Sequence, residues 1–289
     1  MSITPCPYVT VTSPSVLISY LSANGHFWDE KKRETFRAFL TPPFVSPPPS
    51  LPSFCFQPPN MSPVIYSYPN NPRVAKSKIV ASLSGVSVED AAEFQMGVTN
   101  KTDDYLSKVV SGTVPGLIDG DFGLFESNAI AFYLAKKKPG NTLLGSNTEE
   151  EAQILQWLEF ECGTYSMAVG FWVYPVLGYM PFRREMYERA KTMTHRALGM
   201  LERQLTKGDY LVGNRLTLAD VVIACALKMP MSMVLSPEHR APYPHVVKYF
   251  ERLTAMDAFK QVLGEVTLCT EEAKAKDHVE PTLDTSGEC

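Results

Sequence analysis

The sequence predicts a mixed α/β domain followed by an all-helical domain. Short β-prone runs alternate with helical patterns from Met61 to about residue 143, and the β signals stop after KKKPGNTLLGS (136–146). Long stretches of helical apolar spacing follow. We therefore expect a proline-rich extension (1–60), an α/β domain (61–143), an all-helical domain (144–276) and a polar tail (277–289).

The extension holds eleven of the 23 prolines, including TPPFVSPPPSLPSF (41–54). Proline at this density removes backbone donors and disfavours helices and central strands, so we predict disorder. Two alternatives stay open. The PxxP matches could serve a partner's aromatic groove, or Met61 could be the natural start.

Composition excludes several classes of function. The formal net charge of -4 gives no reason to expect nucleic acid as a partner. No apolar run reaches the roughly 20 residues that a membrane helix needs, and the start lacks the basic region of a secretory signal, so we expect a cytoplasmic protein without membrane contact. The six cysteines form no CxxC pair, which favours reduced thiols and predicts no metal site.

The α/β domain begins with a predicted strand, VIYSY (64–68), and a helix in NNPRVAKSKIVASL (70–83), where Asn71 suits the N-cap and Pro72 the first helical position. TVPGLIDGDFGLF (113–125) predicts two strands joined by a turn at Asp119-Gly120. A helix follows in LFESNAIAFYLAKKK (124–138).

The helical domain begins with a predicted helix over 148–176, around Trp157 and Phe160. Residues 183–206 repeat apolar side chains at a spacing typical of a buried helix face, and we assign the whole stripe to the core: Met186, Ala190, Met193, Ala197, Leu201 and Leu205. In RLTLADVVIACAL, Thr217 and Asp220 predict a structural capping box for the next helix.

Glu126 and Ser127 stand where a strand gives way to a helix. The first turn of a helix presents free N–H groups and partial positive charge, so it can bind a carboxylate, and the neighbouring acid can bind a cation. Together they suit the α-amino and α-carboxyl groups of one amino acid. The alternative is a plain serine cap beside a surface glutamate.

Pro115 stands at the head of a predicted strand. A cis Val114–Pro115 bond in a tight turn would expose the backbone of Val114 to an extended peptide. With the Glu126–Ser127 pair, this arrangement suits a small γ-linked peptide.

These features resemble the glutathione transferase superfamily, and most closely the amino-terminal module of the elongation factor 1-gamma family. The resemblance covers about residues 61–270 and rests on IYSYPNNPRVAK, LFESNAIAFYLA, QILQWLEF, YLVGNRLTLADVV and VLGEVTLC. It implies a thioredoxin-like first domain and a homodimer. It also implies that Glu126 and Ser127 bind the γ-glutamyl end of glutathione, that Val114 pairs with its cysteinyl backbone, and that Pro115 is the cis-proline.

The sequence departs from these families at three places. The serine used by many of the enzymes falls near Pro69 or Asn70, which leaves Tyr68 and Asn71 as weak candidates for the thiol donor. TVPGL replaces a KVPAF-like run, and the loss of lysine and gain of Gly116 could weaken the grip on a ligand. The chain ends in a short polar tail where elongation factor 1-gamma continues into another domain, so we expect a truncated or diverged paralogue.

The resemblance therefore predicts a non-catalytic interaction module of the elongation factor 1 complex with a retained glutathione site. Its partners would be other subunits of that complex, above all the nucleotide-exchange subunit. The alternative is an active glutathione transferase that conjugates glutathione to hydrophobic electrophiles.

Overall fold

The computed structural model describes residues 62–275 of the 289. The predictions for the proline-rich extension and for the tail at 277–289 lie outside the described residues.

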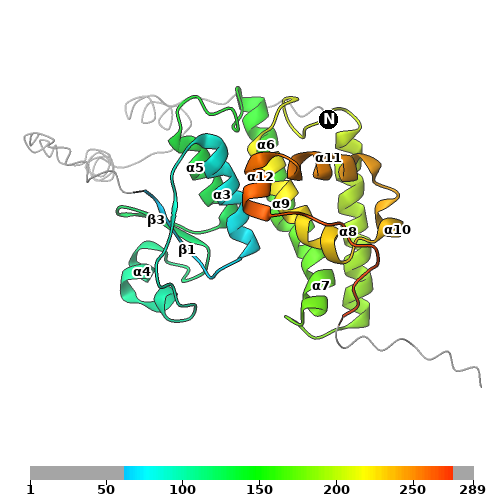
Figure 1. The fold of residues 1–289 in the computed structure, drawn as a ribbon, viewed down its shortest axis with the longest axis horizontal. Coiled ribbons are helices and arrows are strands. Elements are labelled where there is room, and N and C mark those ends of the chain that lie inside the picture. Colours follow the sequence, from blue (N-terminus) through cyan, green and yellow to red (C-terminus); the bar gives the residue numbers. More distant parts are fainter. Residues whose placement is uncertain (1–61, 276–289) are drawn as a thin grey trace, which may run out of the picture. The chain divides into compact units, whose positions relative to one another are not determined.

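The amino-terminal domain is built on a four-stranded mixed sheet. Its elements are β1 (Val64–Tyr66), α3 (Pro72–Ser84), β2 (Glu89–Asp90), the short 3-10 turn η1 (Thr99–Lys101), α4 (Asp103–Lys108), β3 (Gly116–Asp119), β4 (Phe122–Leu124) and α5 (Ser127–Lys137). The strand order is β2-β1-β3-β4, with β2 parallel to β1 and the other pairs antiparallel. Helices α3 and α5 lie side by side, with the sheet between them and α4 (Figure 1). This is the predicted thioredoxin-like arrangement.

Helix α3 begins and ends at the residues that its sequence favours. The side chain of Asn71 accepts a hydrogen bond from the backbone N–H of Arg73 at 3.0 Å, and Pro72 occupies the first turn, where a missing N–H costs nothing. Gly85 ends the helix in the left-handed region, with φ of 63°. The helix buries Ile79 and Val80 against the core.

The carboxyl-terminal domain is all-helical. It contains α6 (Thr148–Phe160), the π-helical turn η2 (Glu161–Tyr165), α7 (Ser166–Leu177), α8 (Arg184–Leu205), α9 (Leu218–Met233), α10 (Pro237–Arg240), α11 (Pro244–Thr254) and α12 (Asp257–Leu263). Residues 264–275 follow without regular structure. The predicted helix over 148–176 is therefore interrupted by a π turn, a feature often found at functional sites.

One expectation about α8 is wrong. Ala190, Ala197, Leu201 and Leu205 are buried as predicted, but Met186 and Met193 are 41% and 45% exposed. The two methionines lie at the edge of the apolar stripe, and no described element covers that edge.

Helix α9 lies at the centre of the molecule. Val221, Val222 and Ile223 are fully buried, and α9 packs against α3 and α5 as well as against α6 and α7. Helix α12 also packs against α3, which places it between the two domains (Figure 1). The two domains therefore share one hydrophobic core.

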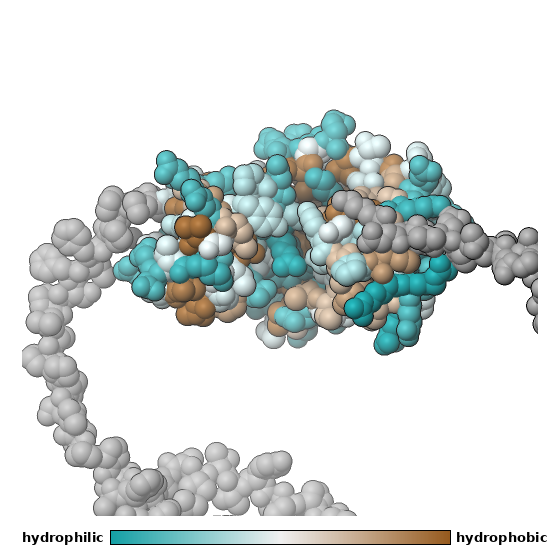
Figure 2. All heavy atoms as spheres, turned by 90° about the horizontal axis from the view of Figure 1, so that it is seen from below, coloured by the Kyte–Doolittle hydropathy of each residue, from teal (hydrophilic) through white to brown (hydrophobic). Residues whose placement is uncertain are grey.

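The surface is mixed in character. Seen from below, polar residues predominate where the two domains meet, and apolar residues gather on the outer side of the amino-terminal domain (Figure 2). The exposed large apolar side chains of that domain include Met96, Val98, Val110, Phe122 and Phe132. No helix within 62–275 is long and apolar enough to cross a bilayer.

Candidate functional site

Sheet register brings three separate segments together at one end of β3. Strand β1 pairs its last residue, Tyr66, with Gly116, so Ser67 follows β1 at the end of the sheet where Pro115 precedes β3. Strand β4 pairs its last residue, Leu124, with Leu117, so Glu126 follows β4 at the same end of the sheet. The predicted site residues therefore converge.

Glu126 and Ser127 lie at the start of α5. Glu126 is exposed and has φ of 66° and ψ of 115°, a conformation uncommon for a residue other than glycine. Ser127 is the first residue of the helix, and no side chain caps the helix. The first N–H groups of α5 are therefore left for a ligand or water, beside a carboxylate that the backbone holds in an unusual position.

The Val114–Pro115 peptide bond is cis, as the sequence analysis predicted. Val114 is half-buried, and no residue within 62–275 makes a hydrogen bond to its backbone. Its N–H and C=O are therefore free to pair with an extended ligand.

Close packing explains why glycine occupies position 116. A Cβ at this position would lie 2.1 Å from the hydroxyl oxygen of Tyr105, which donates to the carbonyl of Thr113 at 2.8 Å. Burial raises the pKa of Tyr105 to about 12, so the phenol keeps its proton and its hydrogen bond. The glycine therefore makes room for the side chain that fixes the segment before the cis bond.

The two predicted candidates for a thiol donor differ in availability. Asn71 uses both ends of its amide: Oδ1 accepts from Arg73 N, and Nδ2 donates to the hydroxyl of Ser67 at 2.9 Å. It is a helix cap. Tyr68 is 44% exposed.

Ser67 is a hydroxyl that the sequence analysis overlooked. It lies just after β1, it is half-buried, and it accepts from Asn71 while retaining its own proton to donate. Its position at the same end of the sheet as Pro115 follows from the antiparallel pairing of β1 with β3, which no short stretch of sequence reveals. The family resemblance instead places the serine of the enzymes near Pro69 or Asn70.

A buried polar network lies directly behind Ser127. The ammonium group of Lys76 donates to Asn128 at 2.7 Å and to Glu161 at 3.1 Å, and Asn128 donates to Glu161 at 2.9 Å. Glu161 opens the π turn and also accepts from Ser166 at 2.5 Å. The network connects the start of α5 to the helical domain, and the sequence analysis identified none of its members.

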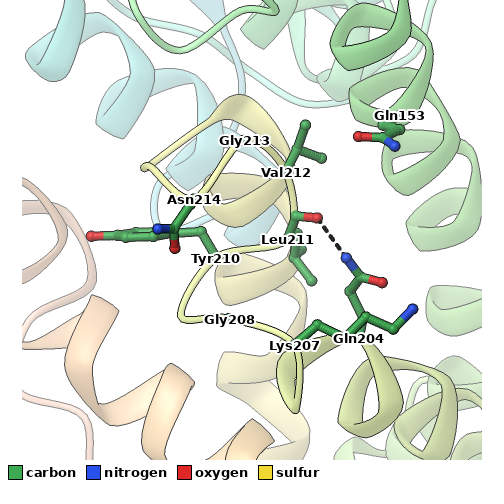
Figure 3. Close-up of a pocket in the computed structure, with 9 residues that line it drawn as sticks. All are labelled: Gln153, Gln204, Lys207, Gly208, Tyr210, Leu211, Val212, Gly213 and Asn214. Atoms are coloured by element: carbon green, nitrogen blue, oxygen red, sulfur yellow. Dashed lines mark hydrogen bonds between the residues drawn. The ribbon is translucent and has the colours of Figure 1, made fainter.

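A separate cavity of about 370 Å³ lies between the end of α8, α6 and the loop before α9 (Figure 3). Gln204 donates to the carbonyl of Leu211 at its wall, at 3.0 Å. This cavity is far along the chain from the Ser67–Pro115–Glu126 region, and it adjoins the predicted capping box. Thr217 and Asp220 form that box as expected. Within 62–275 no group of three or more His, Cys, Asp or Glu side chains could hold a metal ion.

Sequence comparison finds both domains of one family. Residues 61–136 match "Glutathione S-transferase, N-terminal domain" and residues 164–257 match "Glutathione S-transferase, C-terminal domain". The chain therefore has the two-domain glutathione S-transferase fold and is similar to that family in both domains.

Curated relatives place the chain within that family. Elongation factor 1-gamma 1 of Oryza sativa subsp. japonica is 39% identical over 206 residues, covering 71% of this chain and 49% of the relative. Elongation factor 1-gamma of Danio rerio is 38% identical over 214 residues, covering 73% and 48%. The chain is thus of the elongation factor 1-gamma type, and it spans about half the length of these relatives.

Solved structures agree on the fold. The GST-like domain of elongation factor 1-gamma from Saccharomyces cerevisiae superposes with a TM-score of 0.63 at 18% identity, covering 74% of this chain and 98% of that one. The glutathione transferase URE2P6 from Phanerochaete chrysosporium, solved in complex with oxidized glutathione, gives 0.63 at 26% identity, covering 70% and 94%.

We expected a truncated chain that lacks the carboxyl-terminal domain of its relatives. That expectation needs correction. A C-terminal domain, that of the glutathione S-transferase family, is matched over 164–257. The part without a match in this chain is the other half of the elongation factor relatives, about 50% of their length.

Proposed function

We propose that this protein is an interaction module of the elongation factor 1 complex that retains a glutathione-binding site. The observation that carries the proposal is the 39% identity to elongation factor 1-gamma over 206 residues. By that likeness its partners are the other subunits of the complex, in particular the nucleotide-exchange subunit, and it works in the cytoplasm. A homodimer is the expectation from the superfamily.

The residues around Pro115 match glutathione in charge and in hydrogen-bonding character. The carboxylate of Glu126 suits the α-ammonium group of the γ-glutamyl end, and Ser127 with the free N–H groups of α5 suits its α-carboxylate. The unpaired backbone of Val114 suits the cysteinyl backbone. These three groups of the ligand thus each have a counterpart of opposite or complementary character in the protein.

A second function, glutathione conjugation, is favoured by one observation. The Ser67 hydroxyl lies at the same end of the sheet as Pro115 and has a proton to donate. A hydroxyl that donates to the glutathione sulfur stabilises the thiolate and lowers the pKa of the thiol, as an attack on an electrophile requires. Tyr68 is the other candidate for this role.

Calorimetric titration of the full chain with glutathione tests the site. We expect wild-type protein to bind, and both Glu126→Gln and Ser127→Ala to weaken binding about tenfold or more, because each removes a charged or charge-assisted contact. Glu185→Gln, an exposed glutamate on α8, is the matched control and should bind like wild type. Full affinity in both site variants would exclude this site.

A conjugation assay with an aryl halide separates the two functions. Turnover that is lost in Ser67→Ala or in Tyr68→Phe, with glutathione still bound, would establish the transferase and identify its thiol donor. Binding without turnover, together with capture of the purified nucleotide-exchange subunit, is the outcome expected for the interaction module. Failure to capture that subunit would contradict it.

A further inference from the structure

Helix α8 exposes two parallel rows of side chains. The rows contain Met186, Met193 and Met200, which are 41%, 45% and 39% exposed, and Arg189, Arg196 and Arg203, which are also exposed. Residues seven apart are about two helical turns apart, so each row follows the helix axis, and members three apart make the rows neighbours. A methionine row therefore runs beside an arginine row over nearly the full length of α8.

Two members of the methionine row, Met186 and Met193, line one wall of a groove. A hollow of about 210 Å³ lies between α7 and α8, lined by Met167, Ala168 and Phe171 of α7 and by Met186, Arg189, Ala190 and Met193 of α8. Met167 is 59% exposed. Methionine side chains are flexible and polarisable and are over-represented at surfaces that bind helices.

The arginine row has no acidic partner in the described part of the chain. The side chains of Arg189, Arg196 and Arg203 make no ion pair or hydrogen bond within 62–275. Of the three acids on α8, Glu188 lies 4.0 Å from Lys191 and Glu202 lies 2.6 Å from His245, while Glu185 is exposed and makes no ion pair with Arg189. The groove therefore has an apolar lining with the positive charge of Arg189 at its side, and the arginine row continues that charge along α8.

Charge argues against a second copy of this chain as the occupant. An antiparallel pair of α8 helices centred on Met193 would bring Arg189 of one copy opposite Arg196 of the other. Helix α7, SMAVGFWVYPVL, contributes no charged residue that could neutralise them. Like charges directly opposed across an interface are unfavourable.

We infer that the α7–α8 groove docks an amphipathic helix of a partner protein. The partner helix presents apolar residues every seven positions to the methionine row and aspartate or glutamate residues to the arginine row. This surface is separate from the residues around Pro115, so the inference holds whether or not glutathione binds.

Fluorescence anisotropy with the full chain tests the surface. The probes are two labelled synthetic helices as long as α8, both with leucine at heptad spacing, one with glutamate and the other with lysine beside it. The glutamate helix should bind, and the complex should weaken as salt rises. The triple variant Arg189→Glu, Arg196→Glu, Arg203→Glu should bind it about tenfold or more weakly and should gain affinity for the lysine helix.

A matched control makes the same change of charge elsewhere. Lys138→Glu, Lys248→Glu, Lys260→Glu replaces three exposed lysines outside α8 and should leave both affinities unchanged. Equal binding of the two probes, no binding of the glutamate helix, or preference for vesicles of phosphatidylserine would overturn the inference. So would a homodimer, seen by analytical ultracentrifugation, that dissociates only in the α8 variant.

Discussion

Asp220 shows how much one buried residue holds together. Its carboxylate is fully buried and accepts from Leu211 N at 3.0 Å, from Thr217 N at 2.7 Å and Oγ1 at 2.9 Å, and from Tyr249 OH at 3.0 Å. Burial raises the pKa of Asp220, and these hydrogen bonds oppose that effect. The residue joins the loop before α9 to α9 itself and to α11.

The substitution Asp220→Asn should destabilise the fold strongly. It keeps the shape but turns an acceptor into a donor that faces donors, so we expect the free energy of unfolding to fall by about 2–4 kcal/mol. Urea denaturation measures this. Asn147→Ala is the control: Asn147 is an exposed cap that accepts from Glu150 N at 2.9 Å, and its loss should cost about 1 kcal/mol. Equal losses in the two variants would contradict the role given to Asp220.

Local spacing explains which residues the sequence could predict. Thr217 and Asp220 lie three apart, and Asn71 precedes a proline, so both caps could be recognised from neighbouring letters alone. Lys76 could not be placed, because its partners Asn128 and Glu161 are 52 and 85 residues away. Ser67 required the pairing register of two strands separated by a helix.

At the scale of elements, residues 264–275 bind four helices without forming one. Cys269 N donates to Met231 O at 3.0 Å and Ala273 N to Met233 O at 2.8 Å, at the end of α9. The carboxylate of Glu272 accepts from Trp172 of α7 at 2.9 Å, from Tyr187 of α8 at 2.8 Å and from His239 of α10 at 3.1 Å, and it pairs with Lys191.

The hydrogen bonds to the Glu272 carboxylate make the stability of the fold depend on pH in the acid range. Burial alone would raise the pKa of Glu272, but the hydrogen bonds from Lys191, Tyr187, Trp172 and His239 outweigh it and lower the pKa to about 2 from its ordinary 4.5. A carboxyl whose folded pKa is depressed contributes stability above its unfolded pKa. That contribution is lost as the pH falls from about 4.5 toward 2.

Urea denaturation between about pH 6 and pH 2.5 should reveal this contribution. Wild-type protein should lose on the order of 2 kcal/mol more than Glu272→Gln over that interval, after allowance for solvent screening of a partly exposed group. Glu265→Gln, an exposed glutamate of the same segment, should follow the wild-type curve. Parallel curves for wild type and Glu272→Gln would refute the link.

Periodicity predicted the helices but not their environments. The spacing of apolar residues found α8 to within a residue at each end, yet Met186 and Met193 are exposed because periodicity does not show which element covers a stripe. The π turn at Glu161–Tyr165 was also missed, since its five residues carry no distinct pattern.

At the scale of the whole molecule, Lys76 and Glu161 join the two domains. Lys76 belongs to α3 and Glu161 to the π turn, and their side chains are 6% and 8% exposed. Lys76→Met leaves the Glu161 carboxylate buried without its cation, so we expect a loss of about 3–5 kcal/mol in the free energy of unfolding. Lys76→Met with Glu161→Gln should recover most of it.

Two probes measure this effect in urea: tryptophan fluorescence and far-ultraviolet circular dichroism. Lys78→Met is the control, because Lys78 pairs with Asp90 at 2.6 Å on the surface, and its loss should cost no more than about 1 kcal/mol. In wild type the two probes should report one transition, since α3 packs on α9 and α12. Separate transitions in wild type would show that the domains unfold independently.

The fold and most of the candidate site could be predicted because their motifs are contiguous. ESNAI and TVP each lie in one short stretch, and the helical domain follows a clear loss of β signals. The packing of the domains on each other depends on contacts between distant residues, which no short stretch encodes.

The attachment of residues 264–275 also determines where a fusion partner can be joined. A reporter joined after Leu263 in place of the native residues would remove Glu272 and leave Trp172, Tyr187 and Lys191 without their shared acceptor. Joined after Ala275, the same reporter would leave those hydrogen bonds in place. A junction only twelve residues later should therefore decide between a destabilised helical domain and an intact one.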